Sequence, residues 1–172
     1  ARFHTESPFI RPVSAELLWE DRMGVVSNVT FDGSNIVFLT SDIEGNALIA
    51  VKDEAGKILW SWHIWRTDQP EEHTYVNEQG NTYVMMDRAL GSISAVEGDI
   101  GGALYYQWGR KDPFRLNDPT SLTGLSLHPG HKIVGMFSNL SCAVQNPTSF
   151  ATGDDWYSNF NYSVWTNDLK TI

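Results

Sequence analysis

Two histidines, His128 and His131, are close enough in the sequence to bind one metal ion, because they lie in a His-Pro-Gly-His string. Imidazole is a common metal ligand, but a metal site needs further ligands and supporting hydrogen bonds. The Pro-Gly pair favours a turn, and no cysteine or carboxylate lies beside the histidines. We therefore expect an ordinary exposed turn here, with no bound metal and no other cofactor.

The remaining residue types that serve in catalysis are not arranged for it. Asp154 and Asp155 are adjacent, as are Glu71 and Glu72, and neighbours on an extended chain point apart, whereas acid/base pairs need converging carboxylates. Cys142 has no lysine or arginine nearby to stabilise a thiolate, so we expect a small buried side chain rather than a nucleophile. The chain has no nucleophile elbow, phosphate-binding glycine loop or zinc-protease motif. We predict no catalytic residues and a protein that is not an enzyme.

Aromatic and short polar side chains alternate near the end of the chain. Carbohydrate sites use this mixture, with a ring for the apolar face of a sugar and amides for its hydroxyls. The competing interpretation is a β-rich core with polar loops, because aromatic residues more often pack than bind. The candidate ligand-binding residues are Trp156, Tyr157, Asn159, Asn161, Tyr162 and Trp165.

Composition narrows the function classes. The 172 residues carry 12 Lys and Arg against 21 Asp and Glu, a formal charge of −9, which argues against binding to nucleic acid or to an anionic membrane surface. Trp, Tyr and Phe make up 12% of the chain, which suits a β-rich core or a surface that stacks on ligands. The single cysteine excludes an internal disulfide framework.

Short β-type runs separated by turn residues fill the first third of the chain and indicate antiparallel hairpins. The predicted strands are Ala15 to Trp19, Val25 to Phe31, Asn35 to Thr40, Ala47 to Lys52 and Lys57 to Trp65. In the last run, a period of two places Ile58, Trp60, Trp62 and Ile64 on one face, so we expect Trp60 and Trp62 to be buried. His63, on the other face, is expected to be half-buried and bonded to backbone, whereas His4 and His73 are expected at the surface.

The second part of the chain has a different pattern of apolar and loop-forming residues. We predict a β-sandwich-like scaffold over 1–66, an exposed polar connection over 67–80 and a loop-rich region over 81–172. Short apolar runs at Thr82 to Met86, Ala103 to Trp108 and Lys132 to Phe137 stand among Gly, Asn, Ser and Asp. The segment Gly101 to Arg110 is compatible with a helix or a strand, because a short apolar run does not settle its period.

Three strings carry a family resemblance. They are Lys57-Ile58-Leu59-Trp60-Ser61-Trp62-His63-Ile64-Trp65, Met86-Asp87-Arg88-Ala89-Leu90-Gly91 and Tyr106-Gln107-Trp108-Gly109-Arg110-Lys111-Asp112-Pro113-Phe114. In this order and spacing they resemble fimbrillin-family surface proteins of gut Bacteroidetes that carry a domain similar to the Fibrobacter succinogenes major paralogous domain. Two positions depart from that family: Ala89 stands where Asn is usual, and Arg66 stands where an apolar residue is usual.

The resemblance implies a β-rich, α+β protein whose region 81–172 is C-type-lectin-like and, since the family normally continues beyond Ile172, incomplete at its C-terminus. It also implies the cell surface, the outer membrane or the extracellular space, as a lipoprotein or pilus-associated subunit. We expect a cell-surface adhesion or glycan-binding module without catalysis. The alternatives are a structural pilus or envelope subunit that recognises only other subunits and, more distantly, an oxidase like formylglycine-generating enzymes. The expected partners are a glycan or host surface protein, other pilus subunits and the missing C-terminal remainder, but no nucleic acid.

Overall fold

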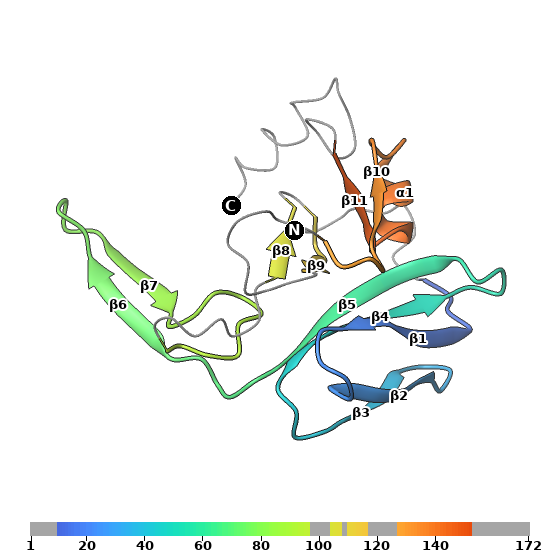
Figure 1. Ribbon diagram of the computed structural model, residues 1–172, viewed down its shortest axis with the longest axis horizontal. Helices are drawn as coiled ribbons and strands as arrows, with labels where there is room; N and C mark the ends of the chain where they lie inside the picture. Colours follow the sequence, from blue (N-terminus) through green and yellow to red (C-terminus); the bar gives the residue numbers. More distant parts are fainter. Residues whose placement is uncertain (1–9, 97–103, 108–109, 117–126, 153–172) are drawn as a thin grey trace.

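The computed structural model describes residues 10–96, 104–107, 110–116 and 127–152. In these residues the chain is β-rich, with several antiparallel strand pairs, a parallel pair and one short helix (Figure 1). The predicted β-rich fold class is confirmed.

The first part of the chain contains the predicted strands. They are β1 (Ser14–Glu20), β2 (Val26–Phe31), β3 (Ile36–Thr40), β4 (Gly45–Lys52) and β5 (Ile58–Arg66). Strands β1, β4 and β5 form an antiparallel sheet in that order, and β2 and β3 pair as a separate hairpin. All these strands begin and end within two residues of the predicted bounds.

The main hydrophobic core lies between this sheet and the β2–β3 hairpin. Val25 and Val26 from the hairpin side are buried against Ala47 and Ile49 of β4. Half-buried apolar side chains surround these four; they are Leu17, Val29, Ile36, Phe38 and Ile64.

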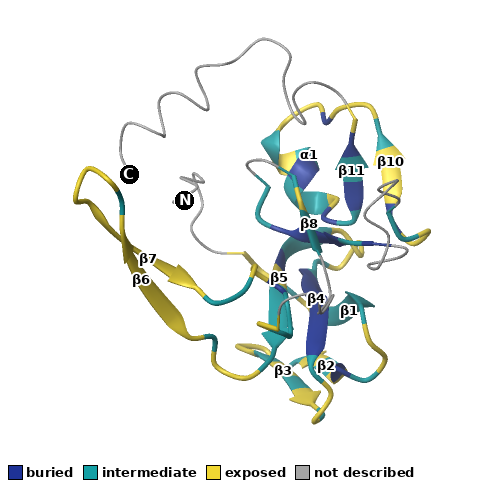
Figure 2. Cartoon of the chain, turned by 60° about the vertical axis from the view of Figure 1, so that its left-hand side comes forward, coloured by how far each residue is buried: buried dark blue, intermediate teal, exposed yellow. Residues whose placement is uncertain are grey.

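Strand β4 is buried along almost its whole length (dark blue in Figure 2). One face carries Ala47 and Ile49 toward the β2–β3 hairpin. Asn46 lies at an alternate position and contacts a later segment of the chain. Its Nδ2 donates to the carbonyl oxygen of Gly91 over 2.8 Å. A nearly continuous apolar run is typical of a strand covered on both faces, so β4 is the central strand that joins the early and late parts of the chain.

Strand β5 corrects one prediction. Trp62 pairs with Ile49 and Ile64 pairs with Ala47, so both lie on the face that the spacing indicates. Ile64 packs against the core, but Trp62 is 37% exposed and Trp60 is half-buried. The prediction that both tryptophans are buried is therefore wrong, because the short β2–β3 hairpin leaves part of this face open. Ser61, on the other face, is the fully buried residue of β5.

Strands β6 (Glu72–Val76) and β7 (Thr82–Met86) form an antiparallel hairpin. Sequence reasoning identified Thr82 to Met86 only as a short apolar run and assigned residues 67–80 to an exposed connection. That segment is largely exposed, yet it contains β6. The hairpin projects away from the rest of the described chain (green in Figure 1, yellow in Figure 2).

The later part of the chain packs beside β5. It comprises the antiparallel pair β8 (Leu104–Tyr106) and β9 (Pro113–Arg115) and a parallel pair, β10 (Lys132–Val134) and β11 (Ser149–Ala151), joined through helix α1 (Leu140–Gln145). The ambiguous segment around residue 105 is thus a strand. A second small core of Phe137, Ala143 and Ala151 holds α1 against β10 and β11.

Candidate functional site

An open groove lies between the β2–β3 hairpin and strand β5. Its volume is about 580 Å³, which is within the range of small-molecule sites. Most of its wall is apolar. The described residues that line it are Ile10, Pro12, Phe31, Gly33, Ser34, Asn35, Ile36, Phe38, Ile49, Val51, Trp62, His63 and Ile64.

Trp62 is the exposed aromatic residue of this groove. The sheet register places it beside Ile49, and Phe31 and Phe38 come from the hairpin opposite. An exposed tryptophan in a concave apolar wall offers a flat surface of large area to a ligand. The groove therefore presents a partly exposed aromatic side chain within an apolar wall.

The rim of the groove is polar where β2 turns into β3. Asp32 holds this turn, because its Oδ1 accepts hydrogen bonds from the backbone N–H groups of Ser34 over 2.9 Å and of Asn35 over 2.7 Å. These hydrogen bonds lower the pKa of Asp32. The carboxylate thus stays charged and fixes the positions of Ser34 and Asn35 at the rim.

His63 is the titratable residue among the described lining residues, and its ring is engaged elsewhere. Its Nε2 lies 2.8 Å from Oδ1 of Asn46, whose Nδ2 donates to Asp21 and to Gly91. The ring is half-buried, as expected, but it bonds to the Asn46 side chain rather than to backbone. Burial lowers the pKa of His63, so the neutral ring donates through Nε2 to the amide oxygen. This network joins β4, β5 and the Gly91 loop.

A second polar cluster lies at the outer edge of β5. Nζ of Lys111 is 2.8 Å from the carbonyl oxygen of Ser61, 2.6 Å from its hydroxyl and 2.7 Å from Oδ2 of Asp112. A Ser–Lys pair resembles a nucleophile with its base, but that chemistry needs a neutral amine. Burial lowers the pKa of Lys111, and the buried Asp112 carboxylate opposes this by favouring the charged amine. The contacts therefore describe an ion pair that anchors β5.

Two other residues of the Tyr106 to Phe114 string, Gln107 and Arg110, hold the region around α1. Arg110 donates to the carbonyl oxygens of Ala143, Asn146 and Ser149, and its guanidinium lies 4.9 Å from the ring centre of Phe137. Gln107 donates to the carbonyl oxygen of Ala151 over 2.7 Å. These contacts of Gln107, Arg110 and Lys111 thus connect parts of the fold.

His131 and Cys142 differ from their predictions. His131 is buried: its Nε2 accepts the N–H of Arg115 over 2.9 Å, and its Nδ1 lies 3.2 Å from the carbonyl oxygen of Thr148. The 128–131 turn forms, but the prediction that it is wholly exposed is wrong, because the ring packs edge-on against Phe114. Cys142 is half-buried rather than buried, beside the second core.

The structure leaves several predicted residues outside its description. All six candidate ligand-binding residues, Trp156, Tyr157, Asn159, Asn161, Tyr162 and Trp165, lie outside the described residues, as do His4, Asp154 and Asp155. His73, Glu71 and Glu72 are exposed, as predicted. The Trp62 groove was missed because the alternation of β5 indicates which face a side chain takes, not how far the opposite layer extends.

The segments that the structure describes contain no cluster of three or more His, Cys, Asp or Glu residues suited to a metal ion. Nor do they contain a helix with the length and apolar character that a membrane crossing requires.

Comparison with known proteins finds no matching family model, no matching curated protein and no matching solved structure.

Proposed function

We propose that this chain is a non-catalytic adhesion module that binds glycans, and that Trp62 in the open groove is its principal contact. The observation that supports this most is the exposure of a tryptophan inside a concave apolar wall with a polar rim. The charged groups of Lys111, Asp112 and Arg110 are engaged in contacts that hold the fold. Binding by stacking needs none of them.

The groove offers both kinds of contact that a sugar ring requires. The C–H face of a pyranose packs on an indole ring, while hydroxyl groups exchange hydrogen bonds with amide and hydroxyl side chains. Trp62 would supply the first contact, and Ser34 and Asn35 at the rim would supply the second. The absence of charge on these three side chains favours a neutral saccharide.

The resemblance to fimbrillin-family surface proteins supports a bacterial surface as the place where this binding occurs, with host or mucin glycans as ligands and other pilus subunits as neighbours. We propose this setting together with the activity.

A glycan array probed with the purified chain tests the proposal. We expect binding to a restricted set of oligosaccharides, loss of about tenfold or more in affinity for Trp62→Ala, and partial retention for Trp62→Phe, which keeps a ring. Met23→Ala, at an exposed apolar side chain outside the groove lining, is the matched control and should bind as the wild type does. If the wild type binds no glycan, the proposal is wrong and the structural-subunit alternative is favoured.

A further inference from the structure

The β6–β7 hairpin exposes apolar side chains on both of its faces. Directly paired residues share a face, and the pairs are Thr74 with Val84, Tyr75 with Tyr83, and Val76 with Thr82. One face therefore carries Val76, Val84 and Met86, and the other carries Tyr75, Tyr83 and Met85. All six are exposed, with Tyr75 at 48% and Val84 at 58%.

Such a ribbon is not stable by burial of its own side chains. A two-stranded hairpin alone is marginal in water, and its unpaired edges invite pairing with another strand. Within the described residues neither β6 nor β7 pairs with a third strand. The two tyrosine rings do stack on each other, with centres 5.3 Å apart, but both remain open to solvent on their outer sides.

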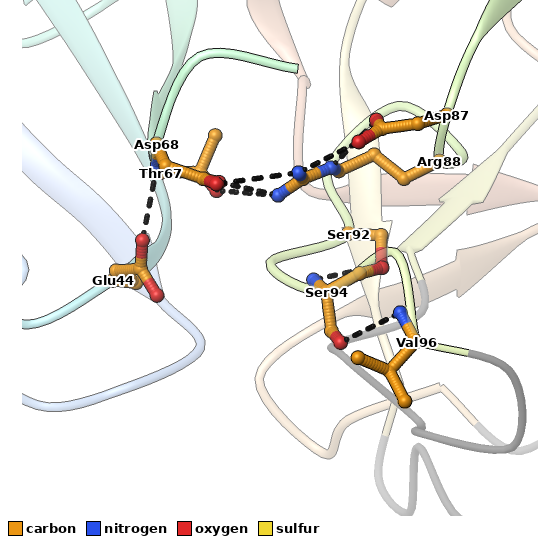
Figure 3. A network of polar contacts seen from close by, with 8 residues as sticks. All are labelled: Glu44, Thr67, Asp68, Asp87, Arg88, Ser92, Ser94 and Val96. Carbon is orange, nitrogen blue, oxygen red and sulfur yellow. Dashed lines mark hydrogen bonds and ion pairs between the residues drawn. The ribbon is translucent and has the colours of Figure 1, made fainter. Parts of the chain in front are cut away.

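The hairpin is nevertheless held in a fixed position at its base (Figure 3). The Arg88 side chain, 5% exposed, donates to both oxygens of Asp87 over 2.8 and 2.9 Å and to Oδ1 of Asp68 over 2.5 Å. Asp68 follows β5, and Asp87 follows β7, so one guanidinium joins the two stems of the hairpin. The backbone N–H of Asp68 also donates to Glu44 over 3.0 Å, which ties the base to the scaffold.

A fixed, projecting apolar element costs less conformational entropy on binding than a mobile one. Its chemistry also restricts the partner. From residue 67 to residue 87 the chain has acidic side chains and no lysine or arginine. The acidic residues of this segment are Asp68 and Asp87, which are paired with Arg88, and Glu71, Glu72 and Glu78, which have no ion pair among the described residues.

We propose that the β6–β7 hairpin inserts into an apolar cleft of a separate protein whose rim carries lysine and arginine. A cleft is required because a flat surface would cover only one of the two apolar faces. A basic rim is required because the ribbon is acidic. A second copy of this chain carries the same acidic hairpin and the same formal charge of −9, so charge complementarity disfavours self-association.

This inference is independent of the proposed glycan site, because the lining of the groove includes no hairpin residue. The two can therefore fail separately. Trp62→Ala should leave hairpin docking unchanged, and a double replacement on the hairpin should leave glycan binding unchanged.

Site-specific cross-linking of the full chain tests the inference. A photo-reactive phenylalanine placed at position 83 is activated in the cells that produce the protein, and the cross-linked protein is identified and purified. Calorimetry of the two purified proteins should then show binding that weakens by about tenfold between about 50 mM and about 500 mM NaCl. Tyr83→Ser with Val84→Ser should reduce the affinity by about tenfold or more.

A charge variant separates the acidic rim from the apolar faces. Glu71→Gln, Glu72→Gln and Glu78→Gln together should bind more weakly at low salt and lose much of the salt dependence. Cross-links only to a second copy, only within the same chain, or to no protein would overturn the inference. An affinity that changes neither with salt nor with the Tyr83 and Val84 replacements would overturn it as well.

Discussion

His131 shows how one buried ring makes stability depend on pH. Because its Nε2 accepts the backbone N–H of Arg115, the ring must be neutral with its proton on Nδ1, toward the carbonyl of Thr148. Protonation would direct a second N–H at the donor of Arg115. Burial lowers the pKa of His131 from its ordinary value of 6.5, and burial lowers that of His63 in the same direction.

We expect the free energy of unfolding to fall as the pH is lowered through about 6.5, where the unfolded chain takes up protons before the folded chain does. The loss should continue until the pH passes the lower pKa of the folded state. Urea unfolding at a series of pH values measures this loss of unfolding free energy. His131→Gln should show a smaller pH dependence, and His73→Gln, at an exposed position, should retain the dependence of the wild type. Equal pH dependence in both variants would contradict the assignment.

Trp62 and Phe114 are large aromatic residues in opposite environments, and a pair of truncations compares them. Phe114 is fully buried, so Phe114→Ala should cost about 3–5 kcal/mol of unfolding free energy. Trp62→Ala should cost less, about 1–2 kcal/mol, since the residue is 37% exposed and lies in an open groove, so that its removal leaves no closed cavity. Urea denaturation of both variants decides the matter. A loss of about 3 kcal/mol or more at Trp62 would show that its ring is part of the core and would remove it as a ligand contact.

Among the elements, the β6–β7 hairpin depends on its base rather than on a core. Arg88→Met removes the charge that joins Asp68 and Asp87, whose pKa values Arg88 lowers chiefly through its hydrogen bonds. We expect faster amide hydrogen exchange throughout β6 and β7 and unchanged exchange in β4. Arg22→Met, at an exposed arginine with no ion pair among the described residues, is the control and should alter neither. Unchanged exchange in β6 and β7 of Arg88→Met would mean that another contact holds the hairpin.

The elements also show which features the sequence can predict. Strand β4 was predictable because its residues form a continuous apolar run, and so was the face taken by Trp62, because β5 alternates. Strand β6 was not predicted, although Thr74 to Val76 favour a strand, because the acidic residues around Pro70 indicate an exposed connection and the strand exists through its pairing with β7. Helix α1 did leave a signal: Asn139 precedes it, and its side chain accepts the N–H of Cys142 over 2.8 Å. Six residues are too few for a periodic pattern to confirm that signal.

In the whole molecule, residues of the three strings that carry the family resemblance connect separate parts of the fold. Ser61 of the first string meets Lys111 and Asp112 of the third, and Gly91 of the second accepts a hydrogen bond from Asn46 of β4. Gly91 has a φ of +87°, and a Cβ there would lie 2.5 Å from Leu104, so this close approach requires glycine. Arg88, Arg110, Lys111 and Asp112 of these strings take part in contacts within the fold, and among the described residues we propose the open Trp62 groove and the projecting hairpin as the surfaces for recognition.

The central claim is that the Trp62 groove binds a glycan, and a nuclear magnetic resonance titration tests it most directly. The chain, labelled with ¹⁵N, is titrated with the oligosaccharide that binds best on the array. We predict saturable shifts of the Trp62 indole N–H and of the backbone N–H groups of Ser34 and Asn35, while those of β6 and β7 stay in place. Saturable shifts confined to residues outside the groove, or no shifts at all, would contradict the claim.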